Sequence, residues 1–376
     1  MTKLRLDFVD LMRGIAMLVM IEVHVVNSLM DMTLRNTSWF GFINFANGLV
    51  APSFIFISGF AFVLASQKKL PEYRKFRYAF WKQLGRIGLI WFTGYMLHIP
   101  YFSLQKCIHI ATERHWLKFQ SIDVLQCIAF GLFIIFILRL VIKNDRIFIV
   151  SVSALGISSV AFAPYAYNAD LSHLPVFVAT YIAPVHYTLF PIFPWFGFMA
   201  AGIWCAWVFT RYNSAGKSYI FFKRLLIVGI LMALISLPLM FYIKDYLGLF
   251  NDVRPNALFF IARLGFVTAL LSLCFYYCQW RGEPSAIILY PSRESLAVYF
   301  IHLQILHREL WKGKSLVDIY PNTLSFWICI VITIAMILAI LPMARIWNYW
   351  KSKYEYFGLI AVWTMIFIGG IIFLLR

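Results

Sequence analysis

The chain has 376 residues, of which 62% are hydrophobic and only 13% are charged. Soluble domains carry about 25% charged residues, so this chain has too few polar side chains to cover soluble surfaces. An aromatic content of 19% excludes a disordered chain. The composition therefore predicts an all-α integral membrane protein, a single polytopic domain over residues 1–376. A spanning helix takes about 20 residues, and we expect ten or eleven of them.

The net charge is +17, with 33 Lys and Arg against 16 Asp and Glu. On a soluble protein such an excess would suggest nucleic acid. Here most of the basic residues lie in short loops between apolar runs, which indicates the positive-inside rule and contact with anionic lipids. Nucleic acid is therefore not an expected partner. The six cysteines form no CxxC pair, so we expect no disulfide framework and no metal site.

Eleven apolar segments are candidate spans. In chain order they cover residues 8–30, 47–66, 83–99, 124–142, 147–163, 187–209, 219–243, 256–278, 286–307, 323–343 and 356–375. The segment 174–186 is apolar but short and contains two prolines, which suggests a re-entrant or interfacial piece. If the N-terminus is cytoplasmic, the inner segments hold 21 Lys and Arg and the outer segments hold 10. This bias predicts a cytoplasmic N-terminus and an external C-terminus.

The first predicted span contains four ionisable residues, Asp10, Arg13, Glu22 and His24. Ionisable groups at membrane depth are costly and usually functional. Arg13 and His24 are eleven residues apart, so both lie on one helix face, about 16 Å apart along the axis. Asp10 precedes Arg13 by three residues and can pair with it. A buried ion pair with a structural histidine is the simpler alternative.

Two later spans add polar candidates. His302 lies in the middle of the ninth span, with Tyr299 one turn before it. Arg263 lies inside the eighth span and needs an anionic partner or substrate. The inner segment 67–86 interleaves cations with aromatic residues. Such a segment is typical of an interfacial helix on anionic lipid, and it could also bind the phosphates of a cytosolic donor.

Several stretches, taken in order, resemble a known family. The run RLDFVDLMRGIAMLVMIEVH is similar to the opening helix of the transmembrane acyltransferase superfamily. Arginine, ten residues, then histidine is a hallmark of its acyltransferase-three group, and Arg13 with His24 fits it. GLVAPSFIFISG, FPIFPWFGFMAAG and SLAVYFIHL are closer to its heparan-alpha-glucosaminide N-acetyltransferase catalytic-domain group. In the eukaryotic glucosaminide enzyme a histidine precedes the Ser-Trp-x-Gly of the first outer loop. Asn36 stands at that place here, which leaves His24 as the candidate.

The resemblance implies acyl transfer from cytosolic acyl-CoA, in particular acetyl-CoA, to a sugar hydroxyl or amine on the outer side of the membrane. Such chemistry needs a base near pH 7, a task that suits neutral histidine. We assign His24 as the base or as a transient acyl carrier, and His302 as a supporting or alternative base. Arg13 would hold the donor with Asp10 fixing its rotamer, and Arg263 is a further candidate for binding substrate.

The expected partners are the acyl donor, a glycan or glycolipid acceptor, membrane lipids and, as an option that the sequence leaves open, a second copy of the chain. A bacterial inner membrane is the expected location. The alternative function is a secondary transporter of a small anion or a lipid-linked intermediate, because such proteins also carry intramembrane Arg, Glu and His.

Overall fold

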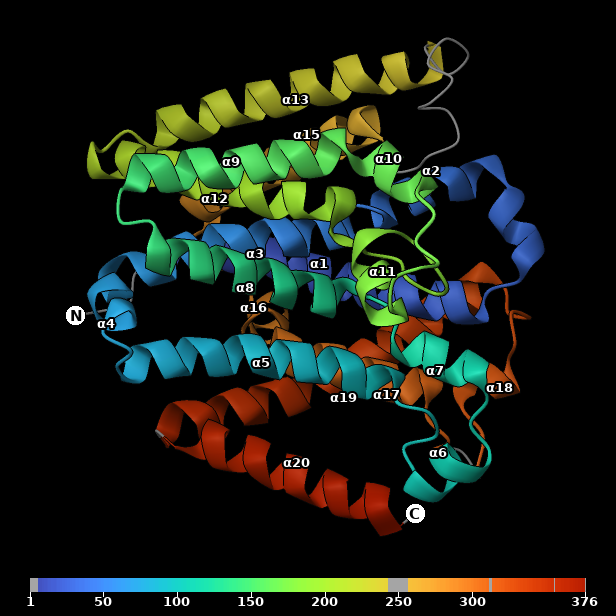
Figure 1. Ribbon diagram of the computed structural model, residues 1–376. Coiled ribbons are helices and arrows are strands. Elements are labelled where there is room, and N and C mark those ends of the chain that lie inside the picture. The colour runs from blue at the N-terminus through green and yellow to red at the C-terminus, as the bar shows by residue number, and fades with distance from the viewer. Residues whose placement is uncertain (1–5, 243–255, 311–312, 355, 376) are drawn as a thin grey trace. The chain divides into compact units, whose positions relative to one another are not determined.

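The computed structural model describes residues 6–242, 256–310, 313–354 and 356–375, and these residues are overwhelmingly helical (Figure 1). Their one β-type contact is an isolated bridge between Met30 and Leu324. The chain packs as two compact units made of interleaved segments. The first unit contains residues 1–50, 99–116 and 278–376, and the second contains residues 51–98 and 117–277.

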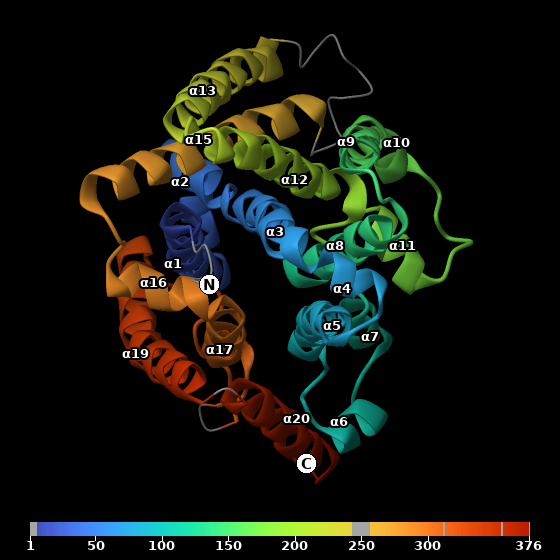
Figure 2. The same ribbon diagram turned by 90° about the vertical axis from the view of Figure 1, so that its left-hand side faces the viewer.

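Helix α1 organises the first unit. It packs against α16, α17 and α19, which lie around it when it is viewed end-on (Figure 2). Gly14 permits this packing, because a Cβ atom there would collide with the side chain and carbonyl oxygen of Ile288 on α16. The elements of this unit are α1 (Asp7–Leu29), η1 (Met32–Asn36), α2 (Ser38–Asn47), α6 (Leu104–His109), α7 (Glu113–Phe119, at the passage to the second unit), α16 (Ala286–Arg293), α17 (Ser295–His307), α18 (Leu316–Ile319), α19 (Phe326–Lys353) and α20 (Phe357–Leu375).

Within the second unit, α9 lies along α12, and α5 lies along α8 (Figure 1). Gly202 on α12 brings that helix against the backbone of α3, because a Cβ atom there would meet the carbonyl of Phe56. The elements are α3 (Val50–Ser66), η2 (Gln67–Lys69), α4 (Leu70–Arg74), α5 (Tyr78–His98), α8 (Val124–Val141), α9 (Asp145–Ala161), α10 (Ala163–Asn168), α11 (Val176–Ile182), α12 (Ile192–Ser214), α13 (Ser218–Tyr242) and α15 (Ala257–Arg281).

The predicted class, an all-α integral membrane protein, is confirmed. Among the described residues, seven helices are long and apolar enough to cross a membrane: Ser38–Ser66, Val124–Val141, Ile192–Ser214, Ser218–Met240, Ala257–Arg281, Phe326–Lys353 and Phe357–Leu375. Four further predicted spans fall on α1, α5, α9 and α17. Helices α9 and α17 have only 17 and 13 residues. Helices α1 and α5 are longer, but their charged and polar residues make them less apolar than the seven helices above. Ten or eleven crossings and a cytoplasmic N-terminus therefore stay predictions.

The predicted span 286–307 is two helices rather than one. α16 contains Pro291, and the chain leaves helical geometry at Glu294 (φ −112°, ψ 31°) before α17 begins. The Glu294 carboxylate is buried, and it accepts hydrogen bonds from Asn348 and Lys351 of α19. The break thus fixes the start of α17 to a neighbouring helix. Two other boundaries also differ, because α12 begins at Ile192 rather than at 187, and only Val176–Ile182 of the segment 174–186 is helical.

Candidate active site

The first unit joins two histidines that are 278 residues apart in sequence. His24 of α1 and His302 of α17 form a hydrogen bond of 3.0 Å between Nδ1 of His24 and Nε2 of His302. Their ring centroids are 5.0 Å apart. His302 is fully buried, whereas His24 is half-buried. The structure therefore brings together the two residues to which the sequence assigns a role as base.

A second hydrogen bond determines which nitrogens carry protons. Nδ1 of His302 lies 2.8 Å from the carbonyl oxygen of Val298. A carbonyl oxygen only accepts, so this Nδ1 must be protonated. In a neutral ring the other nitrogen is then an acceptor, and Nε2 of His302 accepts the proton of His24 Nδ1. In the neutral pair, Nε2 of His24 is consequently the unprotonated nitrogen that can take up a proton.

Tyr299 lies against both rings of the histidine pair. Its ring meets both imidazoles edge-on, with centroid distances of 5.9 Å to His24 and 5.5 Å to His302. The tyrosine is 4% exposed, so it shields the pair from solvent on that side. A shielded hydrogen bond is stronger than one in water and orients the rings more firmly.

Arg13 and Asp10 occupy the first turns of the same helix as His24. Nη1 of Arg13 lies 3.6 Å from Oδ1 of Asp10, as the spacing of three residues predicts. The Asp10 side chain is buried, whereas the Arg13 side chain is 24% exposed and so reaches solvent in part. The acidic residues Asp7 and Asp10 also suit the positive end of the helix dipole.

Other residues chosen from the sequence lie in the second unit. Arg263 is on α15, where its guanidinium stacks over the ring of Phe259 at 4.1 Å. The basic segment 67–86 forms η2, α4 and the start of α5. That Arg263 binds substrate stays a prediction. Arg5, the first residue of the quoted motif, lies outside the described residues.

Hydrogen bonds that the sequence did not predict hold the end of α1. Arg35 donates hydrogen bonds to the carbonyl of Asn27, at 2.8 Å, and to the side chain of Asn322, at 3.0 Å. The backbone of Leu324 adds hydrogen bonds to Leu29 and to Asp31. These contacts join the last turn of α1, and the residues that follow it, to the segment that leads into α19. Arg35 and Asn322 did not stand out in the sequence, because polar residues of this kind are common in loops between helices.

Within the part of the chain that the structure describes, no cluster of three or more His, Cys, Asp or Glu could hold a metal ion. Arg13 and the histidine pair, on helices α1 and α17, are the candidates in this unit for contact with an acyl donor. The arrangement can bind an anion at one end of α1 and move a proton further along it.

The chain was matched by one family model. A model of the catalytic region of heparan-alpha-glucosaminide N-acetyltransferase matches residues 5–245. The match includes Asp10, Arg13 and His24, and it ends before the helices that carry Arg263 and His302. No curated protein matches the chain. Because the matched region covers more than half of the 376 residues, the chain belongs to the heparan-alpha-glucosaminide N-acetyltransferase catalytic-domain family.

Proposed function

We propose that this protein transfers an acetyl group from acetyl-CoA, or another acyl group from its CoA thioester, to a hydroxyl or amine of a sugar. Membership of the family implies a transmembrane acetyltransferase. The single observation that carries the proposal is the chain of hydrogen bonds from Val298 through His302 to His24, because it directs a basic nitrogen away from the pair. The family match gives no support to the transporter alternative.

The chemistry follows from the tautomers of the neutral pair. Nε2 of His24 removes the proton from the acceptor hydroxyl or amine as its oxygen or nitrogen attacks the carbonyl carbon of the thioester. The bond from carbon to sulfur then breaks, and the thiolate of CoA leaves with the proton from His24. If His24 is instead acylated first, its Nε2 attacks the thioester carbon, the carbon–sulfur bond breaks and CoA leaves as the thiolate. The acceptor then attacks the acyl-imidazole, the bond from nitrogen to the acyl carbon breaks, and the acceptor's proton goes to the released Nε2.

His302 would act through His24 rather than on the substrate. When His24 takes up a proton, its positive ring still donates Nδ1–H to Nε2 of His302. A neutral acceptor at that position stabilises the imidazolium and holds the ring at one angle, as the orienting residue of a catalytic triad does. His302 is thus a positioning residue in this proposal.

Arg13 is proposed to bind the donor. A guanidinium forms forked hydrogen bonds with phosphate, and this one is partly exposed beside Asp10. The rise of the helix places Arg13 about 16 Å from His24 along α1. A pantetheine arm is long and thin, so its phosphates could lie at Arg13 while the thioester lies at His24. With a cytoplasmic N-terminus the donor would enter from the cytosol of a bacterial cell and the acceptor from the outer side.

The proposal is tested with protein purified in detergent. Incubation with acetyl-CoA should release the CoA thiol, and addition of an amino sugar or a sugar alcohol should increase this release and give an acetylated product. Thiol release is followed with a colorimetric thiol reagent and the product by mass spectrometry. Failure to consume acetyl-CoA, with or without acceptor, in protein that still melts cooperatively would contradict acyl transfer and favour a transporter.

A further inference from the structure

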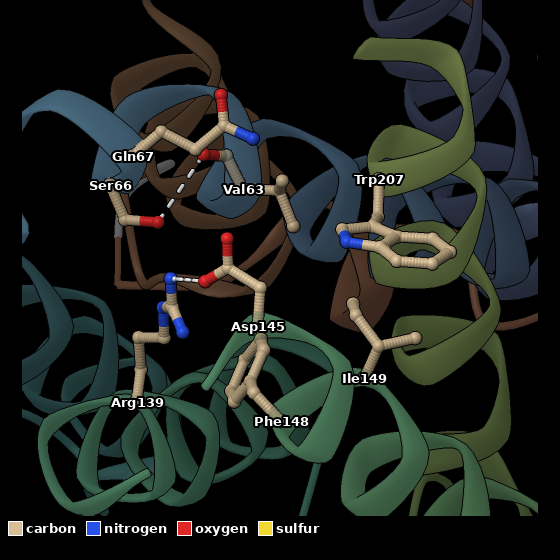
Figure 3. Close-up of a pocket in the computed structure, with 8 residues that line it drawn as sticks. All are labelled: Val63, Ser66, Gln67, Arg139, Asp145, Phe148, Ile149 and Trp207. Carbon is tan, nitrogen blue, oxygen red and sulfur yellow. Dashed lines mark hydrogen bonds and ion pairs between the residues drawn. The ribbon is translucent and has the colours of Figure 1, made fainter. Parts of the chain in front are cut away.

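The second unit contains a pocket at one end of four helices. The pocket is small and partly open, with about 20 Å³ of room for water-sized molecules, and its lining comes from the end of α3, the first residue of η2, the last turn of α8, the start of α9 and one residue of α12 (Figure 3). The lining residues are Val63, Ser66, Gln67, Arg139, Asp145, Phe148, Ile149 and Trp207. None of them has a role in the acyl transfer proposed above.

Arg139 is the buried cation of this pocket. Its side chain is only 9% exposed and points toward Asp145 and toward the side lined by Ser66 and Gln67 (Figure 3). One of its terminal nitrogens, Nη2, donates to the Asp145 carboxylate. The other, Nη1, is buried and has no hydrogen-bond partner among the described residues. The Cζ atom of this guanidinium lies 4.8 Å from the centroid of the Phe148 ring, so the two groups form a cation–π contact.

The Arg139 guanidinium does not cap the C-terminal end of α8. The last carbonyls of that helix already accept hydrogen bonds from a different arginine. Arg74 donates to the carbonyls of Arg139, at 3.3 Å, of Leu140, at 3.3 Å, and of Ile142, at 2.9 Å. The guanidinium of Arg139 is therefore not needed to cap the helix, and among the described residues its hydrogen bond is to Asp145, while Nη1 has none.

The ion pair between Arg139 and Asp145 is strongly asymmetric. The Asp145 side chain is 64% exposed, whereas that of Arg139 is 9% exposed. A solvated carboxylate loses little when it leaves its partner, but a buried guanidinium without a counter-ion is costly. A second anion can therefore replace Asp145 at small cost, provided that it also reaches the buried Nη1.

The surroundings of the pocket favour an anion. Lys143 and Arg146 are exposed on either side of Asp145, and Arg211 stacks over the ring of Trp207 at 3.4 Å. Asp145 is the one carboxylate in the lining. Clustered cations raise the local concentration of anions. The charge bias of the loops predicts that this end of the unit faces the cytosol.

We infer that this pocket binds a phosphate group, with Arg139 as its main ligand and Asp145 as the carboxylate that it displaces. A phosphate oxygen pair matches the fork of a guanidinium and would satisfy Nη1 and Nη2 together. Such a group occurs on soluble phosphate monoesters and on the headgroups of anionic phospholipids. The inference does not depend on acetyl transfer at His24.

The test measures the melting temperature of purified full-length protein as phosphate replaces chloride at constant ionic strength. Asp145→Asn leaves Arg139 without its counter-ion, so bound phosphate should raise the melting temperature of this variant by roughly 3 °C or more at saturation. Wild type should respond less, because Asp145 competes. The double variant Asp145→Asn with Arg139→Met should show only the general salt effect of phosphate.

Matched control variants distinguish phosphate bound at Arg139 from phosphate attracted by exposed cations. Arg146→Met removes one exposed cation from the same loop and should respond like wild type. Arg139→Met should fold, because the Asp145 that it leaves is mostly in water, and direct titration should show phosphate binding weakened roughly tenfold or more. Equal responses of Arg146→Met and Arg139→Met to phosphate would overturn the assignment of Arg139.

The source of the phosphate is decided with two probes on Asp145→Asn in detergent. Stabilisation by inorganic phosphate identifies a site for soluble phosphates. Stabilisation by phosphatidylglycerol added to the micelles, with no effect of inorganic phosphate or of phosphatidylcholine, identifies a lipid headgroup site. If neither probe stabilises the variant beyond the double variant, the pocket is not a phosphate site and the inference is overturned.

Discussion

At the residue scale, the tautomer of His24 is set by the ring of His302, which does not need to contact substrate. Nδ1 of His302 is held by the Val298 carbonyl at 2.8 Å, so Nε2 of His302 accepts from His24 when both rings are neutral. This arrangement needs no acidic residue in the pair. A neutral acceptor avoids the cost of a buried carboxylate at membrane depth.

Substitution of His302 by Ala should lower kcat by at least about tenfold, because His24 loses the partner that orients it and stabilises its imidazolium. The KM for acetyl-CoA should change little, since His302 does not bind the donor. His302→Gln, whose side-chain oxygen can accept from His24, should recover part of the loss. Steady-state kinetics of the three proteins check this, and a rise in KM with unchanged kcat would contradict the positioning role.

Substitution of Arg13 by Ala should raise the KM for acetyl-CoA, and Arg13→Lys should recover it only in part. A guanidinium offers a fork to phosphate that an ammonium cannot match. Each lost charged hydrogen bond is worth about 1.5–3 kcal/mol, which corresponds to at least a tenfold rise in KM. An unchanged KM in both variants would mean that Arg13 serves only its pair with Asp10.

At the element scale, the approach of α1 to α16 decides where the two histidines meet. Gly14 lies directly against Ile288, so an added methyl group would meet a backbone carbonyl that cannot turn aside. The break at Glu294 then sets the start of α17, because its carboxylate is bound by Asn348 and Lys351. Small shifts at these two points would be carried along α1 and α17 to the histidine pair.

Gly14→Ala should therefore reduce both stability and kcat. Overpacking of this kind costs about 1–3 kcal/mol, which exceeds the gain of up to about 1 kcal/mol from replacing glycine in a helix. Gly41→Ala is the matched control, because this glycine of α2 has no atom near its Cβ position. The check is to measure the melting temperature and the kcat of Gly14→Ala and of Gly41→Ala and to compare each with wild type. Equal behaviour of both variants would show that contact at Gly14 does not hold the site together.

Part of the site could be predicted from the sequence alone. The pair of Asp10 and Arg13 follows from helical spacing, and His24 and His302 stand out because ionisable residues are rare in apolar helices. Their contact could not be predicted, since no local pattern joins residues 278 positions apart. The break at Glu294 was missed, although the sequence carries a sign of it, because the polar run PSRES at 291–295 interrupts the apolar segment there. A proline alone does not predict a break, since Pro342 lies inside the unbroken helix α19.

At the scale of the whole molecule, composition alone identified a helical membrane protein, because its polar residues are too few to cover soluble domains. The division of the chain into two interleaved units could not be predicted from the sequence. Each unit is assembled from segments that are far apart along the chain, and apolar periodicity carries no information on which helices become neighbours. The orientation in the membrane still rests on the bias of 21 to 10 basic residues.

That orientation has a consequence for sidedness. With the N-terminus cytoplasmic, Arg13 lies near the inner surface and His24 about 16 Å further out. In proteoliposomes of one orientation, acetyl-CoA should support turnover only from the side of the N-terminus, while a membrane-impermeant sugar should be acetylated only from the opposite side. Product formation when both substrates are supplied on the same side alone would contradict transfer across the membrane.

The measurement that tests the central claim most directly is the kcat of His24→Ala in purified protein, with acetyl-CoA and acceptor both saturating. We predict a loss of about 10²- to 10⁴-fold, the usual contribution of a general base, at a melting temperature close to that of wild type. His109→Ala, which removes an exposed histidine from α6, should retain full activity. If His24→Ala keeps more than about a tenth of the wild-type kcat, the histidine pair is not the catalytic base of this protein.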